Sequence, residues 1–133
     1  MNYIENFGKL KSYTDDRGGS LIPIEFKQLN FIPKRIFTVT GVPKDHVRGE
    51  HAHYTTRQIL ICLEGKILVG LDDGIKLTET ILNPGEYIYI ENYIWDYQKF
   101  LTGNDVMVVL ASTEYDPNDY INDKNDFYRV VKK

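Results

Sequence analysis

Two of the three histidines in the chain stand two positions apart, at His51 and His53. On a β-strand such residues point to the same face, about 6.5–7 Å apart along the chain, so an inward-facing strand would place both imidazoles in one cavity. An unperturbed imidazole titrates at about pH 6.5 and can both take and give a proton. The pair suits acid–base catalysis, although the spacing alone fits two surface or structural histidines equally well. His46 stands alone in a polar loop, where we expect an exposed side chain.

The positions after the histidines decide whether a metal site is expected. Gln58 follows at a spacing that resembles the first cupin motif, and residues 83–86 resemble the start of the second. The ligand set of a metal-binding cupin (His, His, Glu, His) would become, in order, His51, His53, Gln58 and Asp96. Glutamine is a neutral, weak ligand, so we expect no catalytic metal. A His-His-Asp facial triad of the kind used by non-haem iron remains conceivable.

The elements that must position these residues are short apolar runs separated by turn residues such as Glu64-Gly65 and Asn83-Pro84-Gly85. Eight such runs cover residues 20–26, 34–40, 57–63, 66–71, 75–82, 87–90, 95–101 and 106–112. Their spacing of roughly ten residues predicts an all-β sandwich or barrel formed by one domain, 1–133. The resemblance to the cupin motifs implies that this barrel is a cupin-like jelly roll.

Only the C-terminal region shows helical features. Asp116 followed by Pro117 predicts a short helical turn, because the acid can cap it and proline fits its first position. The charged run 119–126 is expected to be a solvated tail.

Composition excludes several classes of partner. The 133 residues include 16 basic and 19 acidic side chains, a net charge of −3, whereas nucleic-acid-binding proteins normally have a basic excess. No apolar run approaches the roughly 20 residues that span a bilayer, and the first residues lack the regions of a secretory leader. We therefore expect no nucleic acid, no membrane association and a cytoplasmic location. Cys62 lies in an apolar run and is expected to be a buried, unreactive thiol.

A longer motif, Arg48-Gly49-Glu50-His51-Ala52-His53 with Gln58 downstream, resembles the cupin-fold nucleotide-sugar 3,4-ketoisomerases. The resemblance extends over nearly the whole chain, through residues 15–21, 35–37, 41–43, the Trp95 segment, 112–115 and 119–121. Two positions depart from it: Phe37 stands where many relatives have tyrosine, and Asp96 where relatives have histidine or arginine. These departures leave the configuration of the product at C4 open.

The resemblance implies a reaction and a set of roles. Members convert dTDP-4-keto-6-deoxyglucose to a 3-keto-6-deoxyhexose through an enediol, with no metal or other cofactor. It implies that His51 is the acid/base between C3 and C4, and that His53 assists or orients the sugar. Arg48 and Arg17 are the expected diphosphate partners, because guanidinium pairs with phosphate. The other expected substrate-binding residues are Gln58, Phe37, Trp95, Asp96 and Tyr97, although Trp95 fits a core position equally well.

The resemblance also implies a homodimer, often with exchanged N-terminal strands, and a place in the assembly of 3-amino-3,6-dideoxyhexoses for surface glycans. Three alternatives remain at this point. One is a dTDP-4-keto-sugar 3,5-epimerase on the same fold, which the short chain and the histidine pair disfavour. The others are a metal-dependent cupin enzyme and a non-catalytic cupin that binds a sugar.

Overall fold

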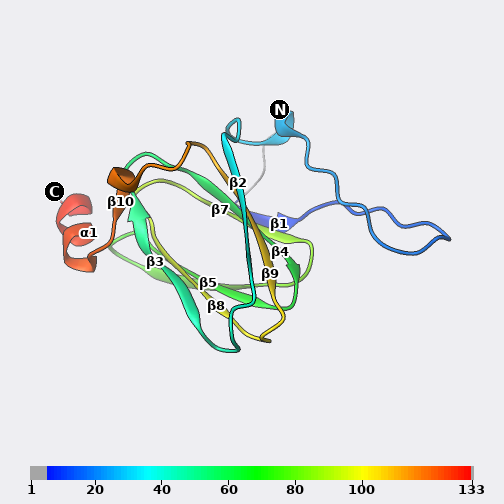
Figure 1. The fold of residues 1–133 in the computed structure, drawn as a ribbon. Coiled ribbons are helices and arrows are strands. Elements are labelled where there is room, and N and C mark those ends of the chain that lie inside the picture. The colour runs from blue at the N-terminus through cyan, green and yellow to red at the C-terminus, as the bar shows by residue number, and fades with distance from the viewer. Residues whose placement is uncertain (1–5, 133) are drawn as a thin grey trace.

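Two antiparallel five-stranded sheets face each other in the structure, a computed structural model that describes residues 6–132 (Figure 1). The first sheet has the order β1 (Phe7–Lys9), β7 (Glu86–Ile90), β4 (Gln58–Glu64), β9 (Val106–Ala111), β2 (Arg35–Thr40). The second has the order β10 (Tyr120–Ile121), β3 (Val47–His53), β8 (Trp95–Phe100), β5 (Ile67–Asp72), β6 (Leu77–Leu82). The all-β prediction is confirmed. No helix among residues 6–132 is long and apolar enough to cross a membrane.

Apolar side chains from both sheets fill the space between them. Strand β4 illustrates why its sequence reads as a continuous apolar run rather than an alternating one. Leu60 and Cys62 point into the space between the sheets, while Ile59 and Ile61 are covered on the outer face by Leu29 and Phe31 from the segment before β2. Burial raises the pKa of the Cys62 thiol to about 11, which agrees with the expected unreactive side chain.

The N-terminal region differs from the prediction. Residues 20–26 do not form a strand; the structure has an isolated bridge between Tyr13 and Leu21 and a short 3₁₀ helix, Phe26–Gln28. Pro23 offers no N–H for a ladder, which disfavours a strand at this position. The segment around the bridge forms an arm that extends away from the two sheets (Figure 1).

The C-terminal region contains more structure than predicted. Asp116 caps the expected turn, a 3₁₀ helix at Pro117–Asp119. It is followed by the helix α1 (Lys124–Val131), so the prediction of a solvated tail was wrong. Asp123 caps α1, and Phe127 is fully buried on the outer face of the second sheet. A helix of eight residues with one buried aromatic is too short to give a clear period of 3.6.

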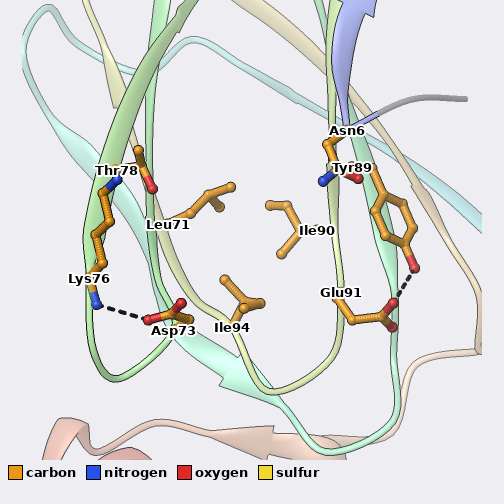
Figure 2. A pocket seen from close by; sticks show the side chains of 9 residues that line it. All are labelled: Asn6, Leu71, Asp73, Lys76, Thr78, Tyr89, Ile90, Glu91 and Ile94. Carbon is orange, nitrogen blue, oxygen red and sulfur yellow. Dashed lines mark hydrogen bonds between the residues drawn. The ribbon is translucent and has the colours of Figure 1, made fainter.

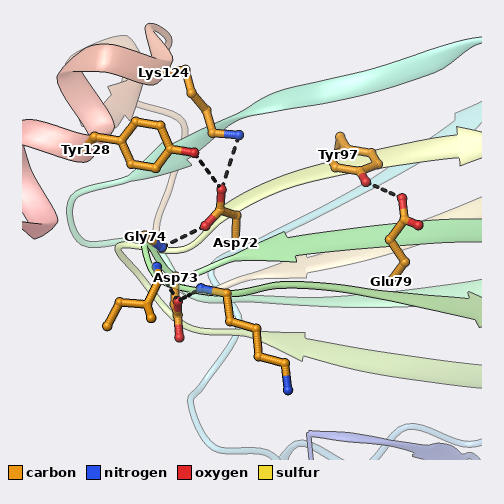
Figure 3. A network of polar contacts seen from close by, with 9 residues as sticks. Asp72, Asp73, Gly74, Glu79, Tyr97, Lys124 and Tyr128 are labelled. Atoms are coloured by element: carbon orange, nitrogen blue, oxygen red, sulfur yellow. Dashed lines mark hydrogen bonds and ion pairs between the residues drawn. The ribbon is translucent and has the colours of Figure 1, made fainter.

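A cluster of polar contacts fastens α1 to the sheet (Figure 3). The Asp72 carboxylate, at the end of β5, accepts a hydrogen bond from the Tyr128 hydroxyl at 3.1 Å. It also pairs with Lys124 Nζ at 3.3 Å and accepts the Gly74 N–H. The helix is therefore joined to the barrel by both apolar and charged contacts.

Candidate functional site

A β-bulge in β3 turns the histidine segment toward the interior. The register with β8 shifts between Gly49 and His51, and Glu50 has a φ of 62°. Gly49 has a φ of 88°, and a Cβ there would lie 3.0 Å from Gln98 Oε1 and 3.1 Å from the Tyr97 Cα. Glycine is therefore required at this position, for both its backbone conformation and the close approach of β8.

The two histidines lie against each other, as the strand spacing predicted. Their ring centroids are 4.9 Å apart with planes at 79°, and His53 is almost fully buried while His51 is half-buried. Burial lowers the pKa of His51, and burial together with the neighbouring imidazole lowers the pKa of His53 to about 4. Both rings are therefore neutral at pH 7, the form in which His51 can accept a proton.

Asp96 stands directly opposite His51 on β8. It is only 1% exposed, and Gln98 Nε2 donates a hydrogen bond of 2.6 Å to its Oδ1. Among the described residues, neither its Oδ2 nor His53 Nε2 has a hydrogen-bond partner. Burial raises the pKa of Asp96 to about 7, against the lowering effect of the Gln98 bond.

These groups open onto a cavity of about 180 Å³ between the sheets. It is lined by Phe37, Val39, Arg48, Gly49, His51, Gln58, Leu60, Asp96, Gln98, Met107, Val109 and Tyr120. The second sheet supplies the titratable side chains, whereas the first supplies apolar ones and the amide of Gln58. Such a small set of polar groups on an apolar background is typical of a site for a small molecule.

Tyr120, which sequence reasoning missed, packs on both histidines. Its ring centroid lies 5.0 Å from that of His51 and 4.5 Å from that of His53. The residue lies on β10, a strand of two residues paired with the end of β3. No pattern in so short a strand could have indicated this contact.

The neighbouring Asp119 holds Tyr120 in place. Its buried carboxylate accepts hydrogen bonds from the backbone N–H and the hydroxyl of both Thr55 and Thr56, the residues that follow the histidine strand. Asp119 was predicted to lie in a solvated tail, and its burial shows that this prediction was wrong. The β10 strand is thus tied to the histidine segment by side-chain as well as backbone contacts.

Comparison with known proteins places this cavity in a family. The family model described as "FdtA: WxcM-like, C-terminal" matches residues 4–132. The chain belongs to this family. It is also 34% identical over 133 residues to the TDP-4-oxo-6-deoxy-α-D-glucose-3,4-oxoisomerase of Aneurinibacillus thermoaerophilus, with 99% of this chain and 94% of that protein covered.

Solved structures give the same relationship. A 3,4-ketoisomerase from Helicobacter canadensis is 33% identical and has a TM-score of 0.89, with 96% of each chain covered. The sugar 3,4-ketoisomerase QdtA from Thermoanaerobacterium thermosaccharolyticum, solved in complex with TDP, is 35% identical and has a TM-score of 0.88. There the match covers 96% of this chain and 95% of that one. The resemblance inferred from the sequence is confirmed.

Of the expected site residues, the structure gathers Arg48, Gln58, Phe37 and Asp96 around His51. The two residues flanking Asp96 point the other way, because side chains alternate along β8. Trp95 packs on Phe127 beneath α1, at a centroid distance of 5.8 Å, so it is a core residue.

Tyr97 and Arg17 also lie outside the cavity. The Tyr97 hydroxyl donates to Glu79 on the outer surface (Figure 3). Arg17 lies on the N-terminal arm, where it is exposed and paired with Asp15. Because side chains alternate along a strand, an inward-facing Asp96 places Trp95 and Tyr97 outside the cavity. This could have been predicted from the sequence.

The residues that could hold a metal are the two histidines and the buried aspartate opposite them. The donor atoms of His51, His53 and Asp96 lie within 4.8 Å of one another, and these residues form the one group of this kind among residues 6–132. The composition matches the two-histidine, one-carboxylate set of non-haem iron. His51 cannot bind a metal and accept a proton through the same nitrogen, because a coordinated nitrogen has no lone pair left for a proton.

A second recess, of about 290 Å³, lies between the ends of β5 and β7 (Figure 2). Leu71, Ile90 and Ile94 form its apolar floor. Polar groups on its rim are engaged locally: the Tyr89 hydroxyl donates to Glu91 at 2.9 Å, and the Asp73 carboxylate accepts backbone N–H groups in its own turn. The recess contains no histidine, and we place the chemistry in the other cavity.

Proposed function

We propose that this protein is a TDP-4-keto-6-deoxy-sugar 3,4-ketoisomerase in which His51 carries the proton between C3 and C4. The observation that carries the proposal is neutral His51, which lines the cavity and has His53 packed against its ring, in a chain that belongs to this family. The relative from Aneurinibacillus is named for this activity on TDP-4-oxo-6-deoxyglucose. A histidine-to-asparagine variant of QdtA was solved in complex with TDP-4-keto-6-deoxyglucose, so this relative binds the substrate that we propose.

The chemistry requires a base at C3. The C4 ketone acidifies the C3–H bond, so neutral His51 can remove that proton and generate an enediol. The resulting imidazolium then protonates C4, and a carbonyl forms at C3 as O3 loses its hydroxyl proton. The oxidation level changes only within the sugar, so no external oxidant or reductant takes part. His53 packs against the ring of His51 and holds its orientation.

The cavity wall suits the rest of the ligand. Arg48 is largely exposed yet lines the cavity, so its guanidinium can reach a diphosphate outside while the sugar lies within. Gln58 is buried in the wall and can donate to a sugar hydroxyl, and Phe37 offers an apolar face to the deoxy carbon. We place the reaction in the cytoplasm, ahead of a transamination at C3 that would use the new ketone.

We also propose a homodimer in which the N-terminal arms are exchanged. The arm exposes Tyr13 and Leu21, 49% and 63% accessible, and lies away from its own barrel (Figure 1). An exchanged arm would give Arg17 a route to a partner's cavity. Mixing equal amounts of inactive R17A and H51N homodimers then restores up to about a quarter of the wild-type rate per dimer, because about half of the dimers are mixed and each of these has one intact site of two. Failure to restore activity, with subunit exchange verified by mass spectrometry, would exclude a shared site.

Proton NMR in heavy water tests the activity itself. The metal-free, chelator-treated protein is incubated with TDP-4-keto-6-deoxyglucose, and we expect a 3-keto product carrying deuterium at C4 where the imidazolium has exchanged with solvent. The H51N variant should lose at least about 10²–10⁴-fold in rate, the usual contribution of a general base. H46N is the matched control, because His46 is exposed and outside the cavity.

The other outcomes identify the alternatives. Deuterium at C3 and C5 with the ketone still at C4 would mean a 3,5-epimerase. Activity that is absent after chelation and returns with a divalent metal would mean a metal enzyme. Binding of the sugar nucleotide with no turnover under either condition would mean a non-catalytic sugar-binding protein.

A further inference from the structure

The proposed isomerisation moves two protons. One goes from carbon C3 to carbon C4, and the other goes from the hydroxyl at O3 to the new hydroxyl at O4. Once His51 has taken the C3 proton it is an imidazolium, and both of its nitrogens are donors. It cannot accept the O3 proton until it has given up the first. A second proton-transfer group next to His51 would therefore complete the site.

Asp96 has the required position. It is the direct cross-strand partner of His51, and both residues line the cavity, whereas His53 is not part of the lining. Their donor and acceptor atoms lie within 4.8 Å. Directly opposed residues of an antiparallel pair have Cβ atoms about 4.5–5.5 Å apart, so both side chains can contact one sugar ring.

We propose that Asp96 moves the hydroxyl proton from O3 to O4 while His51 moves the carbon-bound proton from C3 to C4. This inference rests on the proposed function. In the first step the Asp96 carboxylic acid gives its proton to O4 as His51 takes the C3 proton, which leaves an enediol, an aspartate and an imidazolium. In the second step the aspartate takes the proton of O3 as the imidazolium protonates C4. Both groups end as they began.

The surroundings of Asp96 favour this role. One carboxyl oxygen accepts from Gln98, and the other has no partner among the described residues, so it is available to a ligand hydroxyl. Burial with a single hydrogen-bond donor favours the carboxylic acid over the carboxylate, and the acid is the form that can give a proton to O4. The titratable or charged groups that face it are His51, His53 and Arg48 from β3 and Tyr120 from β10. Strands β2, β4 and β9 present apolar or amide side chains: Phe37, Val39, Gln58, Leu60, Met107 and Val109.

The test compares two Asp-to-Asn substitutions in the full-length protein. D96N keeps the shape and can still donate a hydrogen bond, but it cannot transfer a proton. We expect D96N to lower kcat by about 10²–10⁴-fold while KM and TDP binding stay within about threefold. The control is D72N, because Asp72 is also buried but lies outside the cavity (Figure 3). It should retain the wild-type kcat.

A second variant keeps the test decisive if D96N is poorly folded. D96A leaves room for a small carboxylic acid. We expect added formate to raise the kcat of D96A at least about tenfold. A D96N kcat within about threefold of wild type, or a folded D96A that binds TDP and gains nothing from formate, would overturn the role of Asp96. The proposed function would still stand in those cases, since the wild type and D72N would be active. An inactive wild type would instead refute the proposed function itself.

Discussion

Buried aspartates occur both inside and outside the cavity, and their surroundings are opposite. Asp105 and Asp119, outside it, each accept four hydrogen bonds, mainly from backbone N–H groups and threonine hydroxyls. Asp96, inside it, accepts one, from Gln98. The exposed fraction of these three residues is between 1% and 7%. The three carboxyl groups are therefore all buried, and they differ in the number of hydrogen bonds that they accept.

This difference separates structural from chemical carboxyl groups. Burial alone would raise the pKa of Asp105 and of Asp119, but hydrogen bonds outweigh it, and both pKa values are lowered. For Asp96 burial prevails, and the pKa rises to about 7. A carboxylate that holds two strands together needs saturated oxygens, whereas one that exchanges a proton with a ligand needs an oxygen left free.

The largest effect expected from this comparison is a pair of opposite pH dependences of stability. Asp96 binds its proton more tightly in the folded state, so its contribution to stability falls as pH rises from about 4 to about 7. The free energy of unfolding of D96N relative to wild type should therefore increase over this range, by up to about 4 kcal/mol. The difference in Tm between the two proteins should rise in the same direction. Asp119 has a lowered pKa, so the stability it provides is present above about pH 4 and is lost on further acidification.

Thermal melts of wild type, D96N and D119N at several pH values measure both trends. D119N should be less stable than wild type at pH 7, and this deficit should shrink below about pH 4. His53 also titrates, with a pKa lowered to about 4, but it is present in all three proteins and largely cancels in the differences. Parallel curves for D96N and D119N would contradict the distinction between the two carboxyl groups.

The next effect concerns the anchoring of β10. D119A removes the acceptor of four hydrogen bonds and leaves the N–H groups of Thr55 and of buried Thr56 without these partners, so we expect a loss of about 3 kcal/mol and a Tm lower by about 10 °C. The control is D116A, because Asp116 is exposed and its carboxylate caps only a single turn. Equal losses for the two variants would mean that the Asp119 contacts add nothing beyond an ordinary cap.

The same contrast explains what sequence could and could not predict. Strands such as 66–71 and 106–112 were predicted within about two residues, because alternation and turn residues are local properties. The shared face of the two histidines also follows from a period of two, whereas Asp96 was assigned to the site by its resemblance to a position of the second cupin motif. The roles of Asp119 and Tyr120 depend on contacts with residues more than sixty positions away, which no local pattern contains.

A smaller effect is expected for Tyr120, whose ring packs on the imidazoles of both His51 and His53. Y120L removes the aromatic face, so we expect the histidine rings to be less well oriented and kcat to fall about tenfold, with KM little changed. Y120F keeps the ring and is the matched variant; it should retain most of the activity if the contact acts by packing. A Y120F loss as large as that of Y120L would instead assign the function to the hydroxyl.

The smallest effect is expected at Asp72, a buried carboxylate that keeps two partners when one is removed. Asp72 accepts from Tyr128, pairs with Lys124 and also accepts the Gly74 N–H (Figure 3). Y128F removes one of these three and leaves the carboxylate paired, so we expect a loss of about 1 kcal/mol, a few degrees in Tm, with unchanged kcat. R129A, which removes an exposed ion pair on the same helix, should have almost no effect. A Y128F loss greater than that of D119A would show that α1, rather than the Asp119 contacts, holds this end of the second sheet together.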